Sequence, residues 1–268
     1  MTVVPILIYH SISRDPAAWI RPFAVTPEAF GRQLDVLVEQ GATTLTVSAF
    51  VDALARRPPA LPERPVLITF DDGFADFYDH ALPALVRRRL AATLYVATGF
   101  VGRRIGGGKT SGERMLDWSQ LADVREAGVE IGGHSHSHAQ LDAIPSSRAA
   151  AELARCKSLL EEGLGIRIAS FAYPHGYSSP RVRRLVVETG YRSACAVKNA
   201  FSSTTDDRYS LARLTVRATT APTQIAAWLA GEGAPPAPVR EPVGTRAWRL
   251  YRRAWVALGL RPAVDLRP

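Results

Sequence analysis

The sequence has little cysteine and no long hydrophobic run, and each shortage excludes a class of protein. Its two cysteines, Cys156 and Cys195, lie far apart and in no metal-binding spacing, so we expect two buried reduced thiols and no disulfide framework. No apolar stretch approaches the roughly 20 residues that a membrane-spanning helix needs. The chain of 268 residues is 47% hydrophobic and 22% charged, which excludes disorder, collagen-like repeats and a coiled coil.

The N-terminus also lacks the features of a secretory signal. The segment Met1–Pro5 has no basic start, and no small-residue cleavage site follows it. We therefore expect either a cytoplasmic protein, with any membrane association at the inner face, or a chain whose leader lies outside this sequence.

Lysine is scarce, and arginine supplies almost all of the positive charge. Of the 33 basic residues 30 are arginine, and the net charge is +8. Residues 233–268 hold seven arginines and two acidic residues, a net of +5, which leaves 26 basic and 23 acidic residues, or +3, for the rest. A nucleic-acid-binding protein would be expected to present a basic face on its folded body. We therefore expect no nucleic-acid partner.

Short β-branched runs alternate with longer segments of helical period, a pattern typical of a parallel α/β sheet or barrel. The predicted strands are Val3–Tyr9, Thr43–Thr46, Val66–Phe70, Thr93–Ala97, Val129–Gly132, Ile168–Ala172, Ser193–Val197 and Leu211–Val216. The predicted helices are Pro27–Gln40, Val47–Arg56, Phe74–Arg89, Trp118–Ala127, Ser146–Leu164 and Ser179–Thr189.

The C-terminal part differs in composition from this body. We predict a catalytic barrel over residues 1–230, a linker rich in Pro, Gly and Ala over 231–245, and a basic amphipathic helix over 246–268. In the last segment Trp248, Tyr251, Trp255 and Leu258 recur at helical spacing. Three interpretations stay open: a helix packed on the body, a helix at a membrane surface with arginines on anionic lipid, or a helix that binds a partner protein.

Chemically active side chains follow the predicted strands. Asp71 and Asp72 come directly after Val66–Phe70, and His134, Ser135, His136, Ser137 and His138 follow Val129–Gly132. Histidines also follow the first strand and the Ile168–Ala172 strand, at His10 and His175. The carboxyl ends of parallel strands meet at one rim, so these groups are expected to converge.

This set of residue types predicts a metal-dependent hydrolase. One Asp and two His form the three-ligand set of an open catalytic zinc site, which leaves a coordination position for water. A second carboxylate can act as the base toward that water, and a further His can protonate a leaving group.

Two of these motifs resemble a known family. Thr69-Phe70-Asp71-Asp72-Gly73 together with His134-Ser135-His136-Ser137-His138 resembles the first two motifs of the polysaccharide deacetylases, which are carbohydrate esterase family four with the NodB-homology fold. The segment 171–176 (Phe-Ala-Tyr-Pro-His-Gly) looks like the third motif, and the resemblance covers residues 1–216. It implies a distorted (β/α)7 barrel that removes N-acetyl groups from amino sugars. The implied cofactor is a divalent metal, Zn²⁺ first, with Co²⁺, Ni²⁺ or Fe²⁺ as alternatives.

The resemblance also implies roles for individual residues. Asp71 corresponds to the general base, and Ser135 braces the second motif. The implied metal ligands are Asp72, His134 and His138.

The third motif departs from the family pattern at two positions. Ala172 stands where an arginine is usual, and His175 stands where a tyrosine usually supplies a backbone N–H to the oxyanion. The second change is mild because any residue except proline supplies that N–H. Tyr173 and His175 remain the expected oxyanion and substrate residues of this motif.

The C-terminal Leu-x-His motif of the family is missing, since the chain reads Arg213-Leu214-Thr215-Val216 there. However, Leu7–His10 resembles a subgroup that includes poly-N-acetylglucosamine deacetylases, in which an N-terminal Tyr-His replaces the missing histidine. His10 is therefore the expected general acid. Arg213 is expected to replace the lost arginine and to pair with Asp71 or Asp117.

Trp118 and Leu141 are candidates for the wall around the acetyl methyl group, with plain core packing as the alternative. The expected substrate is an N-acetylated sugar or glycan that is lipid-linked or nucleotide-linked before export. Two other functions stay open: hydrolysis of another acyl bond, such as an O-acetyl ester or a small amide, and a non-catalytic barrel that only binds glycans.

Overall fold

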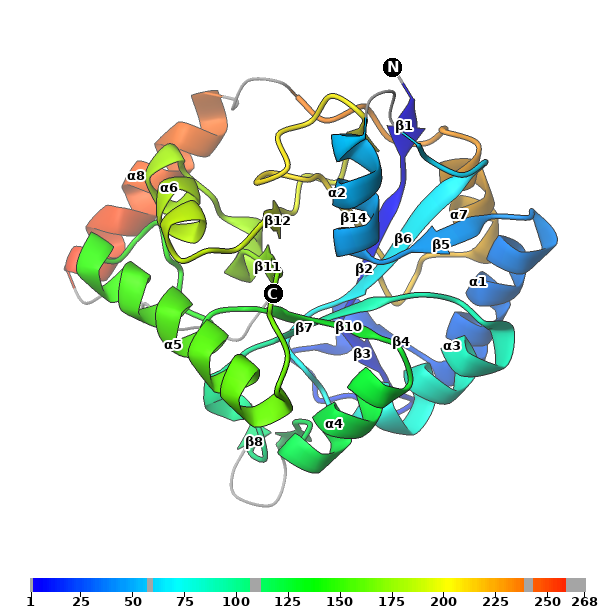
Figure 1. The fold of residues 1–268 in the computed structure, drawn as a ribbon, viewed down its shortest axis with the longest axis horizontal. Helices are drawn as coiled ribbons and strands as arrows, with labels where there is room; N and C mark the ends of the chain where they lie inside the picture. The colour runs from blue at the N-terminus through cyan, green and yellow to red at the C-terminus, as the bar shows by residue number, and fades with distance from the viewer. Residues whose placement is uncertain (1, 57–59, 107–111, 239–242, 259–268) are drawn as a thin grey trace.

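The computed structural model describes residues 2–56, 60–106, 112–238 and 243–258. Its centre is a curled sheet of parallel strands in the order β12-β11-β10-β7-β6-β2-β14, with β5 also paired to β6 (Figure 1). The strands are β2 (Ile6–Tyr9), β5 (Thr43–Leu45), β6 (Pro65–Phe70), β7 (Thr93–Val96), β10 (Glu130–Gly133), β11 (Ser170–Ala172), β12 (Ser193–Cys195) and β14 (Leu214–Thr215). This curled parallel sheet with its outer helices confirms the predicted (β/α)7 barrel class.

Helices cover the outside of the sheet (Figure 1). They are α1 (Pro27–Glu39), α2 (Val47–Ala55), α3 (Leu82–Arg88), α4 (Trp118–Glu126), α5 (Ser146–Leu164), α6 (Pro180–Glu188) and α7 (Pro222–Leu229). Local sequence fixes several starts: the Thr26 hydroxyl accepts a hydrogen bond from Ala29 N, and Pro27 occupies the first turn, where its missing N–H costs nothing. No helix in the described residues combines the length and apolar character that crossing a bilayer would require.

The gap between the two ends of the sheet is bridged by the segment 208–213. Leu211 forms a parallel bridge with Cys195 of β12: Ala196 N donates to Leu211 O at 2.8 Å, and Leu211 N donates to Ala194 O at 3.0 Å. The chain then enters β14, which pairs with β2. This connection places Arg213 inside the barrel between β12 and β6.

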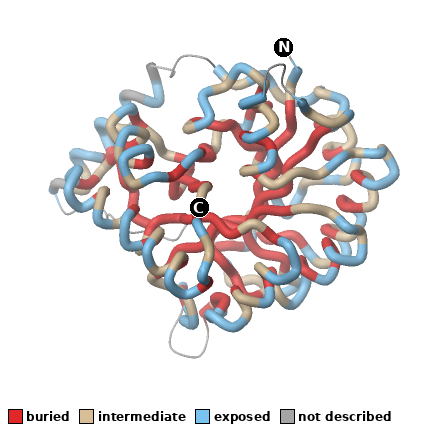
Figure 2. The backbone as a smooth tube through the Cα atoms, in the orientation of Figure 1, coloured by how far each residue is buried: buried red, intermediate tan, exposed pale blue. Residues whose placement is uncertain are grey.

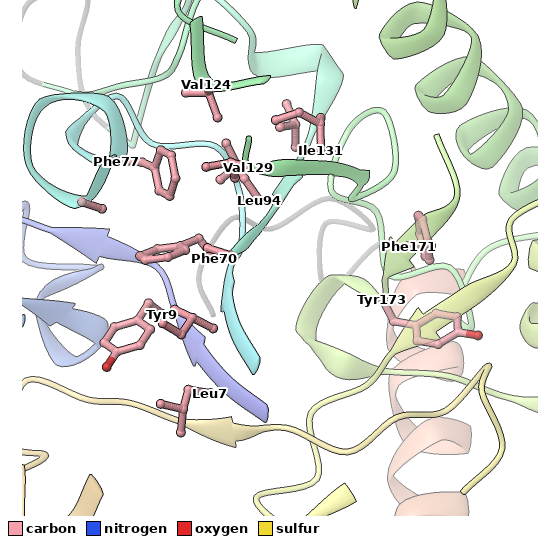
Figure 3. Close-up of a cluster of buried hydrophobic side chains, with 14 of the residues drawn as sticks. Leu7, Tyr9, Phe70, Phe77, Leu94, Val124, Val129, Ile131, Phe171 and Tyr173 are labelled. Carbon is pink, nitrogen blue, oxygen red and sulfur yellow. The ribbon is translucent and has the colours of Figure 1, made fainter. Parts of the chain in front are cut away.

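The core is aromatic beneath the strand ends. Tyr9 stacks on Phe70 at 5.3 Å between ring centroids, and Phe77 meets Phe70 edge-on at 4.7 Å (Figure 3). These rings are fully buried, and in Figure 2 burial is concentrated along the strands. Packed rings on rigid strands hold the loops that follow β2 and β6 in fixed positions.

The structure divides the predicted strand Val3–Tyr9 into β1 (Val3–Val4) and β2, and it adds strand pairings that the sequence patterns did not predict. Three short pairs lie outside the main sheet: β1 with β13 (Ser202–Ser203), β3 (Ser11–Ile12) with β4 (Ala24–Val25), and β8 (Arg104–Ile105) with β9 (Glu113–Arg114). The helix predicted over Phe74–Arg89 contains a π-helical turn, η2 (Phe77–Ala81), before α3. Pro83 explains the irregularity, because it lacks the N–H that an α-helix would use at that position.

The C-terminal helix α8 spans Val243–Ala257. It begins three residues before the helix predicted over 246–268, and residues 259–268 of that prediction lie outside the described residues. Residues 239–242 of the predicted linker lie outside them as well. Helix α8 lies beside α5 and α6 at one side of the barrel (Figure 1).

Candidate metal and catalytic site

Three buried side chains converge where β6 and β10 end. Asp72 follows β6, and His134 and His138 follow β10; one potential ligand atom of each lies within 4.8 Å of the others. Asp72 Oδ1 lies 3.4 Å from His134 Nε2 and 3.3 Å from His138 Nε2. Asp72 and His138 have φ values of 76° and 55°, in the left-handed region that costs energy for residues other than glycine. Backbone strain of this kind occurs in proteins at sites where it orients functional side chains.

Close packing under β10 explains its glycines. A Cβ on Gly132 would lie 2.5 Å from the Tyr95 ring, and one on Gly133 would lie 2.4 Å from the Tyr191 hydroxyl. The strand therefore reaches His134 only with glycines at these two positions.

The ligand atoms fit a divalent cation. His134 Nδ1 lies 2.8 Å from the Ala172 carbonyl, which can only accept, so Nδ1 carries a proton, and in the neutral form of the ring the lone pair is at Nε2, 3.4 Å from Asp72 Oδ1. Asp72 Oδ1 is buried and has no hydrogen-bond partner. A carboxylate oxygen that accepts no hydrogen bond and two imidazole nitrogens together form a ligand set that Zn²⁺ and similar ions bind.

The electrostatics of these residues favour additional positive charge. Burial lowers the pKa of His134, but Asp71 and Asp72 outweigh burial and hold that pKa above its ordinary value. Burial raises the pKa of Asp72, yet His138 and His134 outweigh it and hold that pKa well below its usual range. A bound cation would supply the positive charge that both shifts indicate.

Asp71 lies beside the same histidine, with its Oδ2 3.7 Å from His134 Nε2, but its hydrogen-bond partner is an arginine. Its two carboxylate oxygens accept a bidentate pair of hydrogen bonds from Arg213 at 2.6 and 2.7 Å, and Arg213 is fully buried. The guanidinium also donates to Thr69 Oγ1 and Ala196 O, each at 3.2 Å. Burial raises the pKa of Asp71, but Arg213 and then His134 outweigh it, so the net pKa is lowered and the group stays ionised.

Of the two partners expected for Arg213, the structure shows Asp71. Asp117 instead caps α4, where its Oδ1 accepts from Gln120 N at 2.9 Å and from Ser119 Oγ at 2.7 Å. The alternative pairing of Arg213 with Asp117 was therefore wrong, because capping the helix already uses that carboxylate.

His10 follows β2 and is only 8% exposed. Its ring lies 5.4 Å from the Phe23 ring, and its Nδ1 is buried without a hydrogen-bond partner. Burial lowers the pKa of His10, and nearby Asp72 and Asp71 oppose this shift without cancelling it. The neutral imidazole therefore predominates at pH 7 in the free protein.

His175 lies in the turn Pro174–Gly176 at a φ of 56°. Its ring is 4.7 Å from the His138 ring, its Nε2 is buried without a partner, and burial is the main reason that its pKa is lowered to about 3. Tyr173 is also buried, and its hydroxyl donates to Tyr209 O at 2.9 Å, which commits it to packing.

The remaining expected residues have structural positions. Ser135 Oγ accepts from Ala139 N at 3.2 Å and so braces the loop between the two histidines. Leu141 is buried within the main hydrophobic cluster. The Trp118 indole packs against Gly163 near the end of α5 and is 37% exposed, and its place in an acetyl-binding wall stays a prediction.

The sequence patterns missed three residues beside this site. Asp142, Tyr177 and Arg252 interact with one another next to His175. Their spacing, with Arg252 on a helix 110 residues from Asp142, carries no signal that one sequence could reveal.

Comparison with known proteins identifies the family to which the sequence is similar. The polysaccharide deacetylase sequence model matches residues 59–194, just over half of the chain. A poly-β-1,6-N-acetyl-D-glucosamine N-deacetylase of Staphylococcus epidermidis is 24% identical over 218 residues, covering 78% of this chain and 73% of that protein.

Two solved structures have a similar fold. IcaB from Ammonifex degensii has a TM-score of 0.74 and 27% identity, covering 85% of this chain and 97% of its own. The deacetylase PplD of Streptococcus pyogenes, solved with acetate, has a TM-score of 0.74 and 22% identity, covering 84% of this chain and 96% of its own. With its Asp-His-His cluster and this match, the chain belongs to the polysaccharide deacetylase family, a metal-dependent family, and is a carbohydrate N-deacetylase of the hydrolase class.

Proposed function

We propose that this protein hydrolyses the N-acetyl groups of a polymer of β-1,6-linked N-acetylglucosamine in the production of a cell-surface glycan. The observation that carries the proposal is the buried Asp72–His134–His138 cluster directly beside the Asp71 carboxylate that Arg213 holds. The name of one relative, the staphylococcal N-deacetylase, supplies the substrate class.

Asp72, His134 and His138 are the proposed ligands of the metal, and Zn²⁺ is the proposed ion. A bound divalent ion supplies polarisation of the acetyl carbonyl and lowers the pKa of a water molecule. The protein contributes a fixed ligand set: His134 is oriented by the Ala172 carbonyl, and the loop to His138 is braced by Ser135.

Asp71 is the proposed general base. Its carboxylate accepts one proton from the attacking water while the water oxygen bonds to the acetyl carbon. The two Arg213 hydrogen bonds fix both carboxylate oxygens and keep Asp71 ionised, so the base stays available and correctly oriented throughout the neutral range.

His10 is the proposed general acid. When the C–N bond breaks, the sugar nitrogen takes one proton from the imidazolium and leaves as an amine, while acetate leaves with the water oxygen. Because burial favours neutral His10, its imidazolium is a strong donor and must be formed within the reaction cycle. The backbone N–H of His175 is the proposed donor to the acetyl oxygen.

Three features of the partners and location are also proposals. The exposed Arg253, Trp248 and Tyr251 of α8 support contact with an anionic membrane surface. A lipid-linked glycan at the inner face of the membrane would be presented at that surface. The charge of +3 outside residues 233–268 supports the absence of a nucleic-acid partner.

Acetate release tests the proposal. The purified protein, stripped of metal and reloaded with Zn²⁺, Co²⁺, Ni²⁺ or Fe²⁺, is incubated with a β-1,6-linked N-acetylglucosamine oligomer, lipid-linked and nucleotide-linked N-acetylglucosamine, and an O-acetylated sugar. We expect acetate and a free amine from the oligomer only when metal is present. Acetate from the ester alone would make this protein an O-deacetylase, and bound metal without any acetate would favour a glycan-binding barrel.

A further inference from the structure

Helix α8 is attached to the barrel by a buried ion pair. The Arg252 guanidinium donates to both carboxylate oxygens of Asp142, at 2.8 and 2.6 Å, and it also donates to Gln140 Oε1 at 3.3 Å. Arg252 is 3% exposed and Asp142 is 1% exposed. Asp142 belongs to the segment that follows His138, so α8 holds the same loop that carries the second histidine ligand.

The same guanidinium covers Tyr177. Its central carbon lies 3.5 Å from the centroid of the Tyr177 ring. The hydroxyl of that tyrosine accepts a hydrogen bond from Trp248 Nε1 at 3.2 Å, also on α8. Helix α8 therefore fixes both the ring face and the hydroxyl of Tyr177.

Tyr177 in turn lies against His175. The two rings are 5.6 Å apart at an angle of 23°, and the His175 ring lies 4.7 Å from the His138 ring. A continuous series of ring contacts thus runs from the metal ligands through His175 and Tyr177 to Arg252. No other described helix reaches Tyr177 through both a cation–ring contact and a hydroxyl hydrogen bond.

The energetics favour a positioning role over a purely stabilising one. A buried Arg–Asp pair loses much of its Coulomb attraction to the cost of removing both charges from water, so by itself it adds little stability. Elsewhere on the helix Trp248 and Tyr251 are each 41% exposed and Leu250 is 65% exposed, while Arg249 also lies against Asp142, with its Nε 3.4 Å from Oδ2, and donates to Ser178 O at 3.1 Å. What the pair does provide is one defined geometry of the guanidinium over Tyr177.

We propose that α8 is a strap that completes the active site, and that Arg252 is a positioning residue. It holds Tyr177, which holds the His175 turn so that the His175 backbone N–H faces the acetyl oxygen. The expected effect of Arg252 on turnover rests on the proposed function. A displacement of about 1 Å at a substrate-binding group can reduce turnover by about 10²-fold.

The test compares Arg252→Met with Arg253→Met, a matched control at the next position, where the arginine is exposed. We expect kcat/KM for N-acetyl hydrolysis to fall at least tenfold in Arg252→Met and less than twofold in Arg253→Met, with bound metal unchanged in both. Arg252→Lys keeps the charge but loses the planar guanidinium, so it should restore only part of the activity.

Histidine ring NMR gives a readout that is independent of turnover. The chain has six histidines, which single variants can assign. We expect the His175 signals to shift or broaden in Arg252→Met while the His10 and His134 signals stay unchanged. Unchanged His175 signals, or normal kcat/KM in Arg252→Met, would overturn the strap even if the wild-type protein is active. If the wild-type protein releases no acetate, the proposed function fails, and the His175 signals alone decide the strap.

Discussion

Arg213→Met isolates the interaction between the proposed base and its buried partner. Arg213 is fully buried and Asp71 is 3% exposed, so the methionine leaves a carboxylate in the interior without its bidentate partner. Removal of one member of a buried ion pair typically costs about 3–5 kcal/mol, because the remaining charge is desolvated and uncompensated. At about 2–4 °C per kcal/mol for a chain of this size, the melting temperature should fall by roughly 6–20 °C.

The double variant Asp71→Leu/Arg213→Met removes both charges. Since replacing a whole buried pair with apolar groups is often neutral, we expect the double variant to regain most of that stability, so the two single changes are strongly non-additive. Urea unfolding of the metal-free proteins at pH 7 measures all three variants. Additive losses, or a loss below about 1 kcal/mol for Arg213→Met, would refute the argument that this pair compensates a buried charge.

The same substitution has a catalytic consequence. Without Arg213 the pKa of Asp71 should rise, because burial remains while the main opposing charge is gone. The base is then protonated over part of the neutral range, and its oxygens are no longer fixed. We expect Arg213→Met to retain metal and lose turnover about 10²-fold or more, with the acid limb of the pH–rate profile moved to higher pH.

Three further outcomes are expected. His134→Ala combined with His138→Ala should abolish binding of the divalent ion, as measured by elemental analysis, because two of three ligands are gone. His10→Ala should keep metal but lose amide hydrolysis by about 10²–10⁴-fold in acetate-release kinetics, with a smaller loss for an activated ester that needs no proton. Asp76→Asn should be more stable than the wild type above pH 7, by up to about 3 kcal/mol in urea unfolding, because burial raises the pKa of Asp76 to about 6 and ionisation therefore destabilises the folded state.

The sign of the last effect separates Asp76 from the site carboxylates. A raised carboxyl pKa means that the folded state binds its proton more tightly than the unfolded state does, so stability falls as pH rises from about 4 to about 6. That slope should be absent in Asp76→Asn. For the others, full metal occupancy in the double histidine variant, or normal amide turnover in His10→Ala, would contradict the assigned roles.

Much of the fold was predictable because the local signals agree with the tertiary structure. The helix Ser146–Leu164 was predicted with the bounds that α5 has, and Thr26-Pro27 marks the start of α1 as expected. Helix α7 was missed because only two of its side chains, Ile225 and Trp228, are buried. Such a short apolar face in an Ala-rich segment gives little periodicity to detect.

Part of the site was also predictable from the sequence, and part was not. Asp71, Asp72, His134 and His138 each stand directly after a strand or one loop later, so strand prediction alone brings them to one rim. The bidentate contact between Arg213 and Asp71 depends instead on how the segment 208–213 closes the sheet beside β12. Arg213 could be named as a candidate because the third motif lacks its usual arginine. Its partner, Asp71 and not Asp117, became clear only from the structure, in which Asp117 caps α4.

The contacts of α8 were beyond sequence reasoning for a physical reason. The amphipathic pattern of Trp248, Tyr251 and Trp255 leaves open whether the helix packs on the barrel, lies at a membrane surface or binds a partner protein. In the structure Trp248 and Tyr251 remain 41% exposed, while Arg252, one position further, is 3% exposed. Its charge can be buried only because Asp142 offers two oxygens and Tyr177 offers a ring face at that point. A hydrophobic pattern cannot identify a helix that docks through a charge, since the partners that make the burial favourable lie more than 70 residues away in the sequence.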